Sequence, residues 1–158
     1  IASYETMADF SDAQELTQTC ADAATFRQEM ASAATPVTEY AIIPAIEVGD
    51  WTQDSVFMKF DMKVNDAELF AASWSELMDA NGESGVISDS YGLNRILLGN
   101  SEASHFVYIG AQDFESLVEL DTAVRGSSAF EEYQSEVGNV REVLNTSLIT
   151  PVMNWPKN

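Results

Sequence analysis

Residues 55–78 read SVFMKFDMKVNDAELFAASWSELM, a strand pattern followed directly by a helix pattern. Alternate residues from Val56 to Val64 are apolar, which predicts a strand with one apolar face. The opposite face of this strand carries Phe57, Lys59, Asp61 and Lys63. Asn65 and Asp66 supply capping chemistry for a helix whose apolar residues, including Trp74, recur at helical spacing until Asn81-Gly82. The stretch therefore predicts a strand–helix unit with Trp74 in its core.

The pattern continues beyond this unit to a complete α+β fold. Residues 91–99 and 105–112 predict two strands joined as an antiparallel hairpin. Helical patterns follow at 113–125 and 128–140, broken by Arg125-Gly126, with Asp113 as a cap and a capping box at 128–131. A last strand is expected over 148–155. The order β-α-β-β-α-β is that of a ferredoxin-like plait, whose helices cover one sheet face and leave the other open.

An internal repeat with an offset of 104 residues relates the first third of the chain to its last third. Aligning 1–51 with 105–155 needs no gap and gives eight identities, several of them aromatic. The identical pairs are Tyr4/Tyr108, Asp9/Asp113, Phe10/Phe114, Glu15/Glu119, Leu16/Leu120, Phe26/Phe130, Val48/Val152 and Trp51/Trp155. We therefore expect one and a half tandem repeats. Residues 1–51 form the second half of a ferredoxin-like repeat (strand-helix-strand, with Asp9 capping the helix), and 52–158 form a complete one. The chain is thus expected to be part of something longer.

The β-α-β-β-α-β order, the second helix split by Arg-Gly and the segment SSAFEEYQSEVG at 127–138 resemble the dimeric α+β barrel superfamily. The nearest resemblance is to antibiotic-biosynthesis-monooxygenase-like and stress-responsive barrel proteins. This resemblance implies that two plaits pack their open sheet faces into a barrel, either as a homodimer or as two fused repeats. Members include cofactor-free monooxygenases, haem-degrading enzymes and proteins without known activity, so the fold alone does not fix the function.

Charge and composition exclude several classes of partner. Seven Lys and Arg against 26 Asp and Glu give a formal charge of −19, which disfavours nucleic acids and anionic membranes. One Cys (Cys20) and one His (His105) cannot assemble a zinc or iron–sulfur site, and we expect no cofactor. Cys20 is expected to be a small, partly buried filler. The compartment stays open between cytoplasmic and secreted or periplasmic, and an organism of saline water fits the acidity.

The scarce cations suggest a ligand-binding site. Lys59 and Lys63 share the strand face that would look into a barrel, and Arg95, His105 and Tyr108 on the neighbouring strands could join them. Such a site would hold a small apolar or anionic ligand. Alternatively, Lys59 and Lys63 pair with Asp61 or with acidic groups of a partner, His105 is an exposed imidazole, and Tyr108 only packs. The protein is then either a ligand-binding barrel with monooxygenase-like chemistry or a non-catalytic assembly domain, and a homodimer is expected in both cases.

Overall fold

The computed structural model describes residues 4–34, 40–86, 90–99 and 102–152. The chain divides into two compact units, Ile1–Thr38 and Glu39–Asn158. Each unit is described by itself below. The predicted repeat boundary between residues 51 and 52 stays a prediction, and Trp155 lies outside the described residues.

The first unit contains two helices, α1 (Met7–Thr19) and α2 (Ala21–Ala33). Thr6 is the N-cap of α1, and its side chain forms a capping box with Asp9, which occupies the third helical position. Asp9 was expected to precede the helix, so its predicted place was wrong although its role at the helix start is confirmed. Tyr4 was predicted to lie in a strand, but it lies before α1 and outside any strand. Its ring packs edge-on against that of Phe10, with 5.4 Å between the ring centres.

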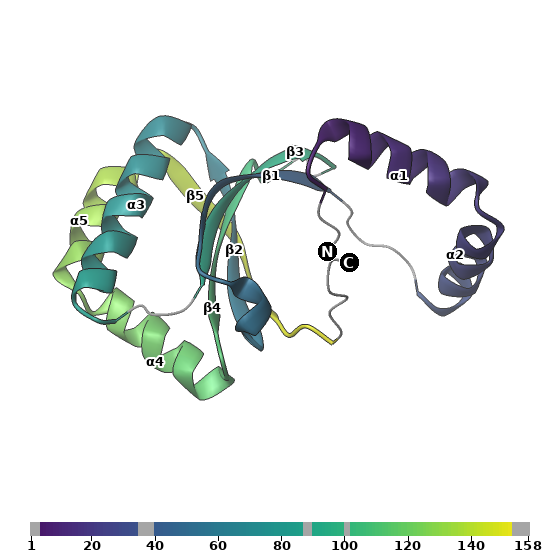
Figure 1. Ribbon diagram of the computed structural model, residues 1–158. Helices are drawn as coiled ribbons and strands as arrows, with labels where there is room; N and C mark the ends of the chain where they lie inside the picture. The colour runs from purple at the N-terminus through teal and green to yellow at the C-terminus, as the bar shows by residue number, and fades with distance from the viewer. Residues whose placement is uncertain (1–3, 35–39, 87–89, 100–101, 153–158) are drawn as a thin grey trace. The chain divides into compact units, whose positions relative to one another are not determined.

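The second unit is built on an antiparallel sheet of five strands (Figure 1). The strands are β1 (Ala41–Val48), β2 (Val56–Val64), β3 (Tyr91–Leu98), β4 (His105–Ala111) and β5 (Arg141–Ile149). Their order in the sheet is β1-β3-β4-β2-β5. The last four elements of this order give the ferredoxin-like plait predicted from the sequence, and β1 adds a fifth strand beside β3. A short 3₁₀ helix, Trp51–Gln53, connects β1 to β2.

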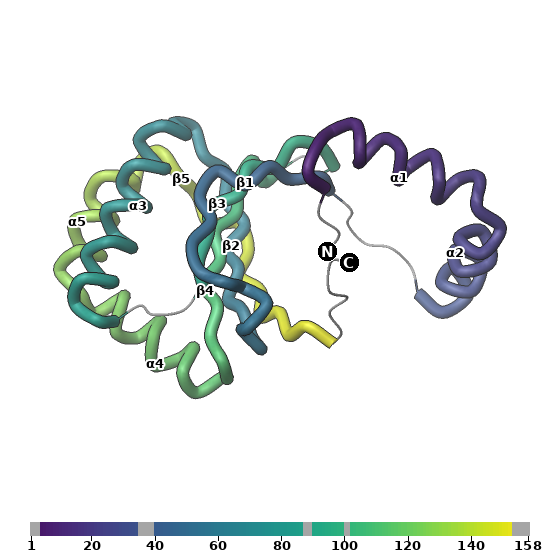
Figure 2. Tube along the Cα trace, viewed as in Figure 1, coloured from purple at the N-terminus to yellow at the C-terminus, as the bar shows by residue number. Residues whose placement is uncertain are grey.

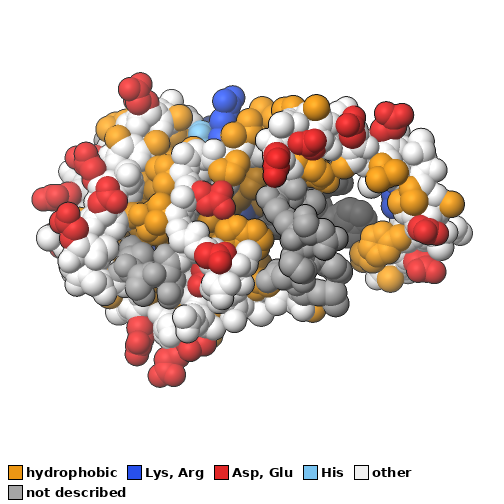
Figure 3. Space-filling view, in the orientation of Figure 1, with side chains coloured by type: hydrophobic (Ala, Val, Ile, Leu, Met, Phe, Trp, Pro, Cys, Tyr) orange, Lys and Arg blue, Asp and Glu red, His pale blue; other side chains and the backbone are white. Residues whose placement is uncertain are grey.

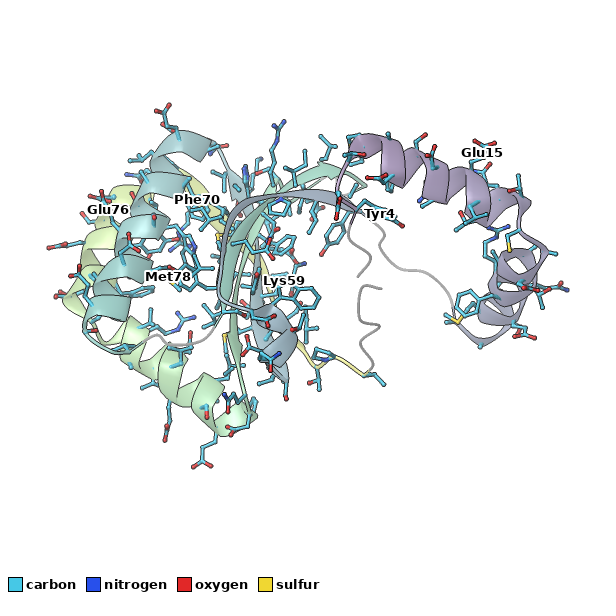
Figure 4. All side chains as sticks on the ribbon, in the orientation of Figure 1. Tyr4, Glu15, Lys59, Phe70, Glu76 and Met78 are labelled. Carbon is cyan, nitrogen blue, oxygen red and sulfur yellow. The ribbon has the colours of Figure 1, made fainter. Side chains whose placement is uncertain are left out.

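Three helices cover one face of this sheet, as the tube in Figure 2 makes plain. They are α3 (Ala67–Glu83), α4 (Phe114–Arg125) and α5 (Ser128–Val137). Phe70 and Met78 lie between α3 and the sheet, whereas Lys59 projects from the other side of the strands (Figure 4). Trp74 belongs to the same buried cluster, which confirms its predicted place in the core. The predicted one-sided helical layer is therefore present.

Several predicted boundaries shift. The last strand is Arg141–Ile149 rather than 148–155, because α5 ends at Val137 against Gly138 and the chain extends immediately afterwards. The first part of this strand was missed because both of its faces are largely exposed and carry apolar residues, so it shows no one-sided alternation. Asp66 and Asp113 cap α3 and α4 as predicted, but Ser127 rather than Ser128 caps α5. Helix α3 runs to Glu83, beyond the expected stop at Asn81-Gly82.

Candidate ligand-binding site

The face of the sheet opposite the helices, here called the open face, carries three of the five predicted site residues. Val107 and Ile109 of β4 point into the core beneath the helices, so the intervening Tyr108 points to the open face. Lys59 lies directly opposite Tyr108 in the β2–β4 register. Lys63, four residues further along β2, shares that face by alternation but is exposed, and its neighbour on β5 is Glu142.

Arg95 and His105 do not join this group. They oppose each other in the β3–β4 register, and each lies two residues from a core residue, Leu93 or Val107. The two-residue period of a strand therefore places them on the helix side of the sheet. The His105 ring accordingly lies 6.5 Å from the ring of Phe70 on α3. The expectation that Arg95 and His105 line the same face as Lys59 was wrong.

Lys59 is buried, with 7% of its surface exposed, and has polar and aromatic partners on the open face. Its ammonium forms an ion pair with Asp61 at 2.6 Å and donates a hydrogen bond to the hydroxyl of Tyr40. The same nitrogen lies 4.9 Å from the ring centre of Tyr40 and 4.6 Å from that of Phe106. The pairing of Lys59 with Asp61, one of the two interpretations of this residue, is thus present.

Tyr108 and the buried carboxylate of Asp54 lie against two glycines of the open face. The Tyr108 ring lies over Gly92, where an added Cβ would meet it at 2.5 Å. An added Cβ on Gly110 would collide with the carboxylate of Asp54, which accepts a hydrogen bond from the Ser90 hydroxyl. Because Gly92 and Gly110 lack side chains, Tyr108, Asp54 and Ser90 can lie directly against the sheet.

Sequence reasoning missed four residues of this face: Tyr40, Asp54, Ser90 and Asn94. Asp54, Ser90 and Asn94 are buried although they are polar. Glycines inside the predicted strands were the available signal, since a strand glycine often marks the close approach of another group. Tyr40 had no such signal, because its contact with Lys59 depends on where β1 joins the sheet.

The electrostatics of the open face define what its groups can do. Burial, together with the negative charges of Glu47 and Asp54, raises the pKa of Tyr108 to about 12. Its phenol therefore stays protonated at neutral pH and serves as a hydrogen-bond donor rather than as a base. Among the described residues of this face, Lys59 is the buried cation. Asp54 and Asp61 contribute carboxylates to the same face, and Asp61 is the one paired with Lys59. The face thus offers a positive charge, a hydroxyl donor and aromatic surface.

We expect His105 to make the protein's stability sensitive to mild acid. Burial and the nearby charge of Arg95 lower the pKa of His105 below its ordinary value of 6.5. The unfolded chain then binds a proton at His105 more readily than the folded chain does. The contribution of neutral His105 to the free energy of unfolding is therefore complete above about pH 6.5 and is lost as the pH falls through the lowered pKa. We expect the free energy of unfolding in urea to fall between pH 7.5 and pH 5. The variant His105→Gln should show a flatter dependence, and equal slopes for the two proteins would contradict the assignment.

Within residues 4–34, 40–86, 90–99 and 102–152, no three His, Cys, Asp or Glu side chains gather as a metal site would require. None of the helices in these ranges combines the length and the apolar character needed to cross a bilayer.

Comparison with known proteins gives a likeness of fold. The sequence matches no protein-family model and no curated protein sequence. Among solved structures, the chain resembles a candidate monooxygenase from Lactobacillus acidophilus NCFM with a TM-score of 0.55 and 14% identity. The match covers 87% of this chain, which spans only 62% of the length of that structure. A major regulator of staphylococcal pathogenesis matches with a TM-score of 0.47 and 12% identity, over 76% of this chain and 74% of that one.

The fold is a ferredoxin-like α+β plait. At 14% identity the likeness to the monooxygenase structure supports this architecture and carries no residue of a catalytic site across.

Proposed function

We propose that the protein binds a small, largely apolar molecule bearing an anionic oxygen on the open face of its sheet, within a barrel closed by a second plait. The observation that carries this proposal is the buried Lys59 ammonium, which lies 4.9 Å from the ring centre of Tyr40 and 4.6 Å from that of Phe106. A buried cation beside aromatic surface suits a ligand whose charged oxygen meets the ammonium while its apolar body lies against the rings.

The hydrogen-bonding capacity of Lys59 leaves room for such a ligand. An ammonium carries three N–H donors, and Asp61 and Tyr40 are its two hydrogen-bonding partners among the described residues. A third donor can reach a carboxylate or an enolate oxygen. The neutral Tyr108 hydroxyl, from the residue opposite Lys59 in the β2–β4 register, is suited to donate a second bond to the same ligand.

The chemistry that we propose for this site is cofactor-free oxygenation. A carboxylate, Asp54 or Asp61, would remove a proton from an activated CH₂ group, and Lys59 would stabilise the enolate that forms. The enolate carbon would reduce molecular oxygen to a peroxide, and loss of water would leave a carbonyl. The balance is one CH₂ group plus O₂ giving one C=O group plus H₂O. The likeness of fold to a candidate monooxygenase supports this class of reaction.

A non-catalytic assembly domain is the second candidate. It is favoured by the ion pair between Lys59 and Asp61, which already neutralises the cation without a ligand. In that case the open face exists to pack against another plait, and its polar residues fix the geometry of the interface.

Calorimetric titration with 2-naphthoate and its neutral amide tests the ligand proposal. Removing Lys59 alone would leave Asp61 unpaired, so the informative protein carries Lys59→Met together with Asp61→Leu. We expect 2-naphthoate to bind the parent chain and to bind this double variant at least about tenfold more weakly, a loss of roughly 1.4 kcal/mol. The amide should bind both proteins equally. Lys63→Met, on the same strand and face but exposed, is the matched control and should bind like the parent.

Oxygen uptake with anthrone, which has an activated CH₂ group, tests the proposed reaction. Uptake above the uncatalysed rate that falls in the Lys59 and Asp61 double variant supports cofactor-free oxygenation. Binding of 2-naphthoate without oxygen uptake would limit the function to ligand binding. If the protein neither binds 2-naphthoate nor takes up oxygen with anthrone, the non-catalytic assembly domain becomes the favoured function.

A further inference from the structure

Asn94, near the middle of β3, is a buried polar side chain on the open face of the sheet. Leu93 beside it belongs to the core beneath the helices, and Ile96, two residues further along, belongs to a separate cluster with Phe106. The two-residue period of the strand therefore places Asn94 on the open face. Only 5% of its surface is exposed.

The sheet around Asn94 offers no hydrogen-bond partner for its side-chain amide. The residues directly opposite it on the neighbouring strands are Pro44 and Phe106. Its neighbours on the same face of β3 are Gly92 and Ile96. None of these four residues has a polar group in its side chain. Among the residues that the structure describes, the Asn94 amide accordingly makes no hydrogen bond.

An unpaired amide at this position destabilises the free protein, yet a ligand can reach it. A buried amide that has left water without a hydrogen bond disfavours folding, whereas an apolar side chain of the same size does not. In the described part of the chain, the fully enclosed polar atoms without a partner are Trp74 Nε1, Asn81 Oδ1 and Arg141 Nε. The amide of Asn94 is not one of them, so it keeps some contact with the surroundings of the sheet.

We infer that the Asn94 amide binds a second, neutral polar group of the ligand, a carboxamide or lactam. An Asn side chain places a carbonyl acceptor beside N–H donors, and an amide of the ligand presents the complementary pair. This inference rests on the proposed function and names its ligand class more closely. The anionic oxygen of the ligand meets Lys59, and its amide meets Asn94.

The register of the strands sets the spacing of these two contacts. Phe106 has Asn94 opposite it on one side and Asp61, the partner of Lys59, on the other. Asn94 and Asp61 are therefore two strand spacings apart, about 10 Å. The Lys59 ammonium lies 4.6 Å from the ring centre of Phe106. A bicyclic aromatic ligand packed against Phe106, with an anionic group at one end and an amide at the other, suits this arrangement.

The acidity of the chain favours a neutral second group over a second anion. The formal charge is −19, and Asp and Glu side chains are spread over the visible surface with few Lys or Arg among them (Figure 3). A ligand with two negative charges is repelled by this field more strongly than one with a single charge. The neutral amide of Asn94 offers a second anion no compensating charge.

Calorimetric titration of the full chain with three naphthalene derivatives tests the inference. We expect 6-carbamoyl-2-naphthoate to bind the parent chain at least about tenfold more tightly than 2-naphthoate, and 2,6-naphthalenedicarboxylate to bind no more tightly than 2-naphthoate. In Asn94→Leu the preference for the carbamoyl compound should disappear, while 2-naphthoate binds as before. A preference that survives in Asn94→Leu or is absent from the parent chain would overturn the inference, as would tighter binding of the dicarboxylate.

Urea unfolding of Asn94→Leu distinguishes a binding role from a structural one. Leu has nearly the shape of Asn and needs no hydrogen-bond partner, so the unfolding midpoint should shift to a higher urea concentration. A lower midpoint would mean that Asn94 stabilises the free protein, and the inference would then be wrong.

Asn145→Leu is the matched control. Asn145 lies opposite Asp61 on β5, but it is exposed and its amide donates a hydrogen bond to the Ser147 hydroxyl at 2.9 Å. This variant should keep the preference for the carbamoyl compound and show no rise in the unfolding midpoint. Loss of the preference here would place the ligand amide on the other side of Phe106 and overturn the inference.

The failure of this inference can be told apart from that of the proposed function. If neither naphthoate binds the parent chain, the proposed function fails and the inference fails with it. If 2-naphthoate binds and the carbamoyl group adds nothing, only the role of Asn94 fails.

Discussion

Replacing Lys59 with Met is expected to lower the free energy of unfolding by about 3 kcal/mol. The Lys59 ammonium and the Asp61 carboxylate are 2.6 Å apart, and both side chains have little exposed surface. The substitution leaves Asp61 as a poorly solvated carboxylate without its cation, and it removes the hydrogen bond to Tyr40. Urea unfolding followed by tryptophan fluorescence measures the change.

The double variant Lys59→Met with Asp61→Leu separates the cost of an unpaired charge from the value of the pair. Because both charges are removed together, we expect this protein to recover most of the stability lost in the single variant. Lys63→Met on the same strand should change the free energy of unfolding by less than about 0.5 kcal/mol, since Lys63 is exposed. A single variant as stable as the parent would show that Lys59 is not held by Asp61.

Phe70→Ala is expected to destabilise the fold by about 3–5 kcal/mol. Phe70 has no exposed surface, and its ring lies 6.4 Å from Tyr133 of α5 and 6.5 Å from His105 of β4. The Phe70 side chain of α3 thus packs against both α5 and the sheet. Its loss leaves a cavity that these neighbours can fill only in part. The midpoint and slope of a urea unfolding curve give the change in free energy.

Phe114→Ala is the matched control for this experiment. Phe114 begins α4 and is 59% exposed, so its truncation should change the free energy of unfolding by less than about 0.5 kcal/mol. Similar losses in the two variants would mean that the buried cluster around Phe70 does not dominate the stability of the unit.

The sequence predicted most of the second unit because local patterns there agree with the tertiary packing. The alternation from Val56 to Val64 and the helical spacing through Trp74 each bury one side of their element against the other. The prediction failed for β5, because Arg141–Ile149 is a sheet edge with both faces largely exposed and has no one-sided pattern. It also failed for Tyr4, which lies outside any strand.

The candidate site could be predicted only in part. Lys59 was found because the alternation of its strand assigns it to a face, whereas Arg95, His105 and Tyr108 were assigned without fixing the phase of their strands. A shift of one residue moves a side chain to the opposite face, so the phase had to come from Leu93 and Val107 in the core. Asp54 and Ser90 lie outside the strands, and their approach to Gly110 depends on the path of the flanking loops.

By itself, the sequence determined the order of strands and helices from Val56 to Ile149, the one-sided helical layer and the acidity that disfavours nucleic acids. These properties follow from periodicity and charge, which are local. Only the tertiary structure decided that β1 joins the sheet beside β3, that Lys59 pairs with Asp61 and Tyr40, and that His105 faces the helices. Each of these depends on contacts between residues distant in the chain, and such contacts are fixed by the register and packing of the whole sheet.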